Sequence, residues 1–170
     1  MNDKMPITLT VNGEVVSQHV SPRDTLADFL RSALQLTGTH LGCEMGACGA
    51  CLVLIEDRPI HACLMFAVQA DGMVIETIEG LNDRGIIADL QEAFHQRNAL
   101  QCGFCTPGML VTAYHLVKTD QASSRELIRD GLSGNYCRCT GYEAIVDAIE
   151  KVASARKADA GRVASEEVGA

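Results

Sequence analysis

The strongest constraint in this sequence is the placement of its eight cysteines, which form two sets of four among 170 residues. The first set is Cys43, Cys48, Cys51 and Cys63, and the second is Cys102, Cys105, Cys137 and Cys139. Disulfides are rare in reducing compartments, where so many cysteines are more often metal ligands or catalysts. Four thiolates per set is the number that one tetrahedral zinc ion or one iron–sulfur cluster takes.

The first set has the spacing C-x4-C-x2-C, with Cys63 further along the chain. This spacing is typical of plant-type ferredoxins, which bind a 2Fe-2S cluster. Gly42, Gly46 and Gly49 lie among these cysteines, and we expect them to supply positive φ angles and close approaches of backbone N–H groups to sulfur. Zinc is the alternative, although structural zinc sites usually contain two C-x2-C pairs and this set contains one.

The second set combines "CGFC" with "CRC", and 31 residues separate Cys105 from Cys137. Alone, "CGFCTP" fits a thioredoxin-like redox pair at a helix start, but no βαβ pattern surrounds it. Zinc is again an alternative, weakened by the single residue between the cysteines of "CRC". Each pair precedes an expected helix, capped by Thr106 in one case and by Thr140 in the other, and the dipole at a helix start would stabilise the thiolate charge. The pattern favours one site with four thiolates.

The N-terminal part of the chain predicts a sheet with one helix. Residues 7–20 alternate apolar and polar side chains around Asn12-Gly13, which predicts a β-hairpin. A helix is expected over residues 21–34, capped by Ser21 with Pro22 in its first turn. Short strands are expected at 51–56, 58–62 and 72–78. The fold class is therefore α+β, with one helix over a mixed sheet.

Only helical patterns follow residue 80. Residues 80–85, "GLNDRG", are expected to be a linker, and helices are expected at 86–98, 106–119, 123–134 and 140–155. Capping boxes are predicted from Ser123 to Glu126 and from Thr140 to Glu143. The final residues lack a periodic apolar face and are expected to form a flexible tail. The predicted units are a domain at 1–80, a domain at 81–155 and a tail at 156–170.

The formal net charge of −8 argues against nucleic acid as a partner, because phosphate contacts need clustered Lys and Arg. It also argues against an anionic membrane surface. No stretch approaches the roughly 18 apolar residues of a membrane span, and residues 1–14 show no apolar signal-peptide core. We therefore expect a cytoplasmic protein that binds neither nucleic acid nor membrane.

Three segments together resemble a known family: "GCEMGACGAC" followed by Cys63, then "QCGFCTPGM", then "GNYCRCTGY". They are similar to the iron–sulfur subunit of the molybdenum hydroxylases, the family of xanthine dehydrogenase, aldehyde oxidoreductase and aerobic carbon monoxide dehydrogenase. The resemblance runs over residues 5–155, with all eight cysteines in order. It implies a ferredoxin-like β-grasp domain followed by a C-terminal four-helix domain, each holding one 2Fe-2S cluster.

The resemblance also implies partners and residue roles. In the family, a large subunit holds a molybdenum–pterin cofactor, here expected in its cytosine dinucleotide form, and a medium subunit holds FAD. This chain would be the small subunit of an αβγ heterotrimer or its dimer, with no substrate chemistry of its own. Electrons would pass from molybdenum through the second cysteine set to the first, and then to FAD. Gln101 matches the glutamine that hydrogen-bonds the pterin, and Cys139 matches a ligand whose surroundings also touch it.

Alternatives stay open at this point. The segments "THLGCE" and "CLMFAVQADG" resemble small subunits of enzymes for heteroaromatic substrates, either N-heterocycles or 2-furoyl-CoA-like thioesters. A carbon monoxide or aldehyde dehydrogenase is the alternative within the family. Outside it, the chain could be a self-standing 2Fe-2S carrier or a zinc-stapled interaction module. His40 and His61 are interpreted as structural histidines, because each set already has four cysteines.

Overall fold

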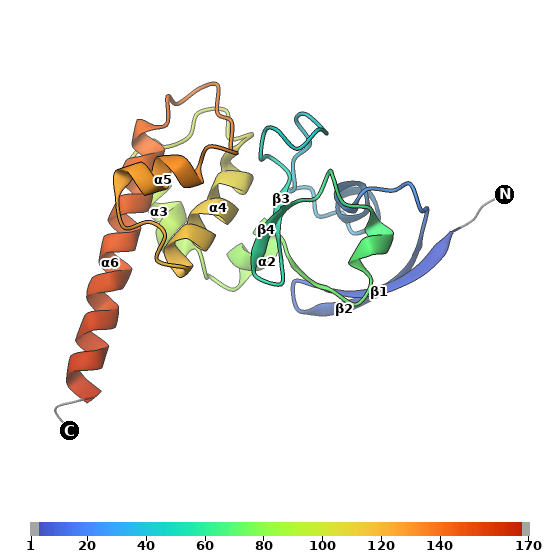
Figure 1. Ribbon diagram of the computed structural model, residues 1–170, viewed down its shortest axis with the longest axis horizontal. Coiled ribbons are helices and arrows are strands. Elements are labelled where there is room, and N and C mark those ends of the chain that lie inside the picture. Colours follow the sequence, from blue (N-terminus) through green and yellow to red (C-terminus); the bar gives the residue numbers. More distant parts are fainter. Residues whose placement is uncertain (1–3, 168–170) are drawn as a thin grey trace.

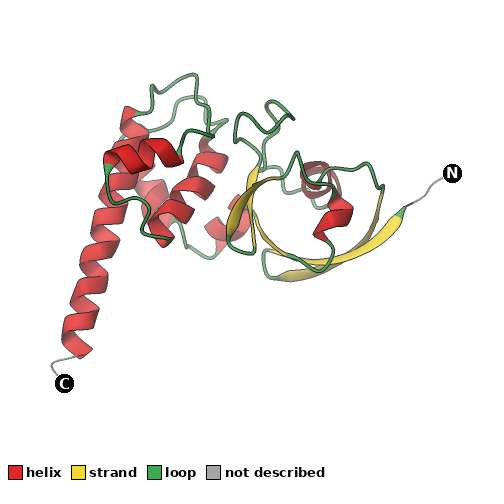
Figure 2. Cartoon of the chain, viewed as in Figure 1, coloured by secondary structure: helices red, strands yellow, loops and turns green. Residues whose placement is uncertain are grey.

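The computed structural model describes residues 4–167 (Figure 1). The strands all lie in the half that contains the N-terminus, and the longer helices all lie in the other half, as Figure 2 shows. Two clusters of buried apolar side chains match these halves, one around Leu9, Leu30 and Ile75 and the other around Phe94 and Ile149. The predicted α+β class is confirmed.

The first two strands form the predicted hairpin. β1 (Met5–Val11) pairs antiparallel with β2 (Glu14–Val20), and Val11 faces Glu14 across the turn. Both turn residues have positive φ, 53° at Asn12 and 88° at Gly13. This conformation matches the right-handed twist of the paired strands, which is why an Asn-Gly pair predicts it well.

Three further strands complete a mixed sheet in the order β2-β1-β5-β3-β4. β3 (Leu52–Ile55) and β4 (Arg58–His61) are antiparallel, and β5 (Val74–Glu76) pairs parallel to β1 and antiparallel to β3. The strands lie inside the predicted ranges but are shorter. One short helix, the helical turn that continues it and a 3-10 helix, η2 (Ala67–Ala70), cover the sheet, as expected of a β-grasp domain.

That helix begins later than predicted. Ser21 and Pro22 belong to a turn, in which the Asp24 amide donates to the Ser21 carbonyl at 3.0 Å. The helix α1 (Leu26–Asp28) starts instead after Thr25, whose side chain and that of Asp28 form a capping box. A π-helical turn, η1 (Phe29–Ala33), continues it. The prediction of a cap at Ser21 was wrong because the capping box at the helix start is formed by Thr25 and Asp28.

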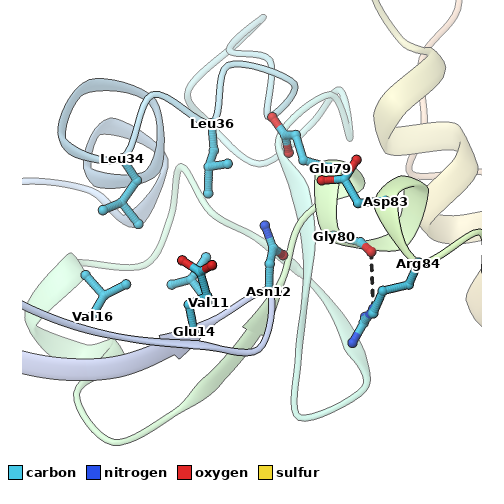
Figure 3. Close-up of a pocket in the computed structure, with 10 residues that line it drawn as sticks. All are labelled: Val11, Asn12, Glu14, Val16, Leu34, Leu36, Glu79, Gly80, Asp83 and Arg84. Carbon is cyan, nitrogen blue, oxygen red and sulfur yellow. Dashed lines mark hydrogen bonds between the residues drawn. The ribbon is translucent and has the colours of Figure 1, made fainter.

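The expected linker at 80–85 is largely a helix. α2 (Ile78–Asp83) packs Gly80 and Leu81 into the interior. A surface cavity of about 320 Å³ lies between α2, the hairpin and the segment after η1. Figure 3 shows Asn12 of the hairpin turn beside the start of α2, with Leu34 and Leu36 on another side of the cavity. The Asn12 carboxamide exchanges two hydrogen bonds with Thr77, and a Cβ on Gly80 would meet Asn12 Oδ1 at 2.4 Å. Gly80 therefore serves close packing rather than flexibility.

Four helices follow, as predicted: α3 (Ala88–Gln96), α4 (Thr106–Lys118), α5 (Arg125–Gly131) and α6 (Glu143–Glu167). Their caps differ from the predicted ones. Cys105 occupies the N-cap of α4, which makes Thr106 the first helical residue. Ser124 caps α5 by accepting from the Leu127 amide, in place of a box from Ser123.

The last helix differs from prediction at both ends. It starts at Glu143 rather than Thr140, and it continues to Glu167 through most of the segment predicted as a tail. The side chain of Arg156 donates to Asp89 on α3 and to the Ile86 carbonyl, which tethers the helix beyond its packed part. Residues 168–170 of the predicted tail lie outside the described part of the chain.

In residues 4–167, no helix has both the length and the apolar character that crossing a membrane would need.

Candidate metal centres

The cysteines lie on loops that meet where the two halves join. Cys43, Cys48 and Cys51 lie between η1 and β3, and Cys63 follows β4. The second set comes from two loops, one between α3 and α4 and one between α5 and α6. In Figure 1 these loops, coloured teal, yellow-green and orange, all lie along the upper edge of the molecule. The fold therefore brings residues far apart in sequence to one side.

The four thiols of the first set fall into two interacting pairs. Cys43 interacts with Cys48, and Cys51 interacts with Cys63. The second pair is buried, with Cys51 2% exposed, whereas the first pair is partly exposed. The Cys48 and Cys51 side chains are also close enough to influence each other electrostatically. His61 approaches this site, with its Nδ1 3.9 Å from Cys51 Sγ.

The second set is paired in the same way. The Sγ atoms of Cys102 and Cys139 lie 3.7 Å apart, and Cys105 interacts with Cys137. Each pair joins one cysteine from the loop before α4 to one from the loop before α6. Cys102 and Cys139 are exposed, whereas Cys105 and Cys137 are half-buried. The two loops are thus both needed to assemble this set.

Two pairs of thiols in each set suit a 2Fe-2S cluster, in which two bridged iron atoms each take two thiolates. A tetrahedral zinc ion would instead need four donors that converge on one point. The donor chemistry and the pairing therefore fit the cluster.

Backbone N–H groups surround the outer thiol of the first set. The amides of Met45, Cys48 and Ala47 donate to Cys43 and lower the pKa of its thiol to about 7. Burial has the opposite effect on Cys51, where desolvation raises the thiol pKa to about 12. Loss of the proton from Cys51 therefore needs a compensating positive charge, which a bound iron ion would supply.

The glycines of this loop act differently from one another. Gly46 and Gly49 have φ of 74° and 72°, as predicted. Gly42 does not have a positive φ. A Cβ there would lie 3.2 Å from Cys48 Sγ, so Gly42 permits a close approach to sulfur. A third positive φ, 54°, belongs to Glu44, a residue type that adopts this conformation less readily than glycine.

Thr140 is a functional candidate that sequence reasoning misassigned as a helix cap. Its amide and its hydroxyl both donate to Cys137 Sγ, at 3.4 and 3.1 Å. Burial opposes ionisation of Cys137, but these bonds, together with those from the Cys139 amide and the Cys105 side chain, outweigh it and lower the thiol pKa. Tyr142 supports the same loop, since its hydroxyl accepts from the Cys137 amide at 2.7 Å and donates to the Asn135 carbonyl at 3.0 Å. The position of Thr140 directly after "CRC" was the available signal.

The loops of the two sets touch directly. The Tyr136 amide donates to the Cys48 carbonyl at 2.9 Å, and Tyr136 precedes Cys137 in the chain. A Cβ on Gly49 would lie 2.5 Å from the Gly134 carbonyl oxygen. One on Gly108 would lie 2.1 Å from the Gly49 carbonyl oxygen. Bare backbone at these glycines is therefore what lets the two halves approach so closely.

A second contact holds the halves together away from the cysteines. The turn between β3 and β4 reaches α4, where Lys118 Nζ donates to Asp57 Oδ1 at 2.7 Å. His115 Nδ1 also donates to the Asp57 carbonyl, at 3.1 Å. The relative position of the two cysteine sets is thus fixed at two points rather than one.

The two predicted pterin contacts lie together on the surface. Gln101 is exposed, and its Nε2 donates to the Cys139 carbonyl at 3.0 Å. Apolar side chains are exposed near them in sequence: Phe104 is 48% exposed and Tyr136 61% exposed. The loops that carry Cys102 and Cys139 thus expose apolar as well as polar side chains.

Two family models match the chain, one on each cysteine set. A model described as a 2Fe-2S iron–sulfur cluster binding domain matches residues 9–74, and one described as a 2Fe-2S binding domain matches residues 77–150. The two models together extend over most of the chain. They agree with the division of the cysteines between a strand-rich part and a helical part.

Individual relatives match over most of their own length. Caffeine dehydrogenase subunit gamma from Pseudomonas sp. (strain CBB1) is 51% identical, over 86% of this chain and 89% of the relative. The nicotine 6-hydroxylase small subunit of Paenarthrobacter nicotinovorans is 47% identical, over 87% of this chain and 89% of the relative. The structure of quinoline 2-oxidoreductase from Pseudomonas putida 86 has a TM-score of 0.84 at 47% identity, covering 93% of this chain and 98% of that chain.

Proposed function

The chain belongs to the family of iron–sulfur small subunits of molybdenum hydroxylases, and from this premise we propose that it relays electrons from a molybdenum–pterin subunit to a FAD subunit. It is then the electron-transfer part of an oxidoreductase and carries no substrate chemistry. The observation that carries the proposal is the arrangement of two four-thiol sites on loops in direct contact.

We assign one 2Fe-2S cluster to each set, with the thiol pairs as the ligands of individual irons. The β-grasp cluster takes Cys43, Cys48, Cys51 and Cys63, and the helical-domain cluster takes Cys102, Cys105, Cys137 and Cys139. Each bound cluster would supply a one-electron redox centre. The chain holds the thiolates, donates hydrogen bonds to sulfur and sets how far apart the two sites lie.

The two sites are proposed to face different partners. Gln101 and the surroundings of Cys139 form the exposed surface that would meet the pterin, because the Gln101 amide has hydrogen-bonding capacity beyond its contact with Cys139. The first set, with its partly exposed Cys43, would face the flavin. Electrons would therefore enter at the helical domain and leave from the β-grasp domain.

The proposed assembly has three kinds of chain: this one, a large molybdenum–pterin subunit with the cytosine dinucleotide form of the cofactor, and a medium FAD subunit. We propose an αβγ complex or its dimer. The names of the relatives support a multi-subunit enzyme, since they are called subunit gamma and small subunit. Eight free cysteines fit a reducing cytoplasm.

We propose a heteroaromatic N-heterocycle as the substrate class. The relatives named above are parts of enzymes for caffeine, nicotine and quinoline, which all contain such a ring. The substrate site would lie on the large subunit, so nothing on this chain selects among these compounds. The iron–sulfur-binding subunit of the aldehyde oxidoreductase of Escherichia coli (strain K12) is 41% identical to this chain, below the 51% and 47% of the caffeine and nicotine relatives.

The test is to purify the complex from its host and measure iron, molybdenum and FAD against this chain. The proposal predicts co-purification with two larger chains, both cofactors, and twice as much iron as one 2Fe-2S cluster supplies. A stable lone monomer with iron but without partners would identify a self-standing carrier instead. A colourless protein with zinc and no iron would exclude both redox functions.

A further inference from the structure

The imidazole ring of His40, which lies on the loop of the first cysteine set, contacts Phe104 on a loop of the second set. His40 lies in the segment before Cys43, and its ring stacks on Phe104 with centroids 4.7 Å apart and planes 21° apart. Its Nδ1 lies 2.7 Å from the Phe104 carbonyl oxygen. A carbonyl oxygen only accepts hydrogen bonds, so this Nδ1 carries a proton and donates it. The imidazole thus holds Phe104 by both its ring and its backbone.

Phe104 lies on a loop of the second set, but its ring approaches the loop of the first set. It lies between Cys102 and Cys105, and a Cβ built on Gly42 would be 3.3 Å from Phe104 Cε1 and 3.2 Å from Cys48 Sγ. The ring edge and a thiol of the first set therefore approach the same glycine. Because Phe104 is exposed, burial in a core does not fix its ring.

We propose that His40 is a positioning residue for electron transfer between the two sites, because it fixes the loop of Cys102 and Cys105 against the loop of Cys43 and Cys48. This inference rests on the proposed function. One electron leaves the helical-domain site, which is oxidised, and enters the β-grasp site, which is reduced, and no bond forms or breaks. The rate of such a transfer falls steeply with distance, so the spacing and rigidity of the two loops are what a side chain here can control.

The second set needs two such ties because it comes from two loops. The bond from the Tyr136 amide to the Cys48 carbonyl ties the loop of Cys137 to the first set. His40 provides the corresponding tie for the other loop, through Phe104. With both in place, each half of the second set is held against the same loop of the first set.

The experiment uses the whole complex, purified with its partner subunits and reduced with dithionite. Electron paramagnetic resonance then measures the magnetic interaction between the two reduced clusters, which depends steeply on their separation and needs no substrate. His40→Leu removes both the stacking and the donor, His40→Phe keeps a stacking ring, and His40→Asn keeps a donor near Nδ1. His95→Asn, at an exposed histidine of α3, is the matched control.

We expect a several-fold weaker and more heterogeneous interaction in His40→Leu, intermediate values in His40→Phe and His40→Asn, and no change in His95→Asn. Iron content and the signal of each cluster should stay as in the unmodified complex. An unchanged interaction in His40→Leu, with both clusters present, would overturn the role of His40 and leave the relay intact. Loss of iron in all three His40 variants would also overturn it, because His40 would then be needed for cluster assembly. Absence of the clusters from the unmodified complex would refute the proposed function itself.

Discussion

The two cysteine sets meet at one junction, yet they are built differently. Three members of the first set come from one continuous loop, and its inner pair is buried against the sheet. The second set is assembled from two loops, and its outer pair, Cys102 and Cys139, is exposed. The first site is completed by its own domain, whereas the second is open at the surface.

The difference extends to how the sulfur atoms are hydrogen-bonded. Backbone amides surround Cys43, so the loop conformation itself stabilises negative charge there. Cys137 depends in part on the hydroxyl of Thr140, a side chain that can be replaced. Where backbone amides stabilise the charge on sulfur, the fold determines how much charge is stabilised. Where a side-chain hydroxyl does so, a single substitution can change the amount. Single substitutions near the second set should therefore change the charge stabilisation at its sulfur atoms, and with it the redox potential, without unfolding the loops.

The largest expected contrast lies within the first set, in the reactivity of its thiols after iron is removed. The pKa of Cys43 is about 7 and that of Cys51 about 12. As pH rises through 7, the thiolate fraction of Cys43 increases sharply while Cys51 stays protonated. Alkylation of the chelator-treated complex near pH 7, read by mass spectrometry, should label Cys43 at least about a hundredfold faster than Cys51. Equal rates would show that iron removal opens the loop or that the buried pair is not buried in solution.

The next contrast tests the junction between the two sets. In Gly108→Ala the new Cβ meets the Gly49 carbonyl oxygen, and overpacking of this kind costs about 1–3 kcal/mol. Alanine should otherwise favour α4 by about 1 kcal/mol. The iron–sulfur absorbance of the purified complex should therefore be lost at a lower temperature. Gly161→Ala is the matched control, since a Cβ on that helical glycine would meet no atom within 4 Å outside its own helix backbone, and the same change should be neutral or slightly stabilising.

The smallest contrast separates the two sites by redox potential. Thr140→Val removes the hydroxyl donor to Cys137 and keeps the backbone donor. Because a donor stabilises the extra negative charge of a reduced cluster, the potential of the helical-domain site should fall, by about 40 mV or less. Redox titration should show no shift in the β-grasp site. Thr140→Ser should restore the potential, and Thr119→Val, on a hydroxyl bonded to the His115 carbonyl, should leave both potentials unchanged.

Sequence patterns predicted the elements of this fold better than their ends. The hairpin at Asn12-Gly13 was predicted because its turn needs residues that tolerate positive φ. The start of α6 was missed because Thr140 resembles a cap, while its hydroxyl is bound to sulfur. The length of α6 was underestimated because residues after 155 lack a periodic apolar face, whereas an ion pair from Arg156 to Asp89 ties the helix to α3.

The site was predictable as two groups of cysteines but not as pairs. Spacing identifies which residues share a loop, and it does not indicate that Cys102 lies beside Cys139 or Cys105 beside Cys137. Contacts between the loops of the two sets could not be predicted from the sequence either, because they join residues about 60 positions or more apart, as His40 and Phe104 do. Such contacts depend on the docking of the two domains and carry no local signal.

The most direct test of the account asks whether each set holds its own cluster. Cys43→Ala and Cys102→Ala, made separately in the whole complex, remove one thiol from each set; alanine is used because serine oxygen can still bind iron. Electron paramagnetic resonance of the reduced complexes should show loss of one cluster signal in the first variant and of the other signal in the second, each with half of the iron retained. If both variants lose the same signal, or if neither loses any, the assignment of one cluster to each set is wrong.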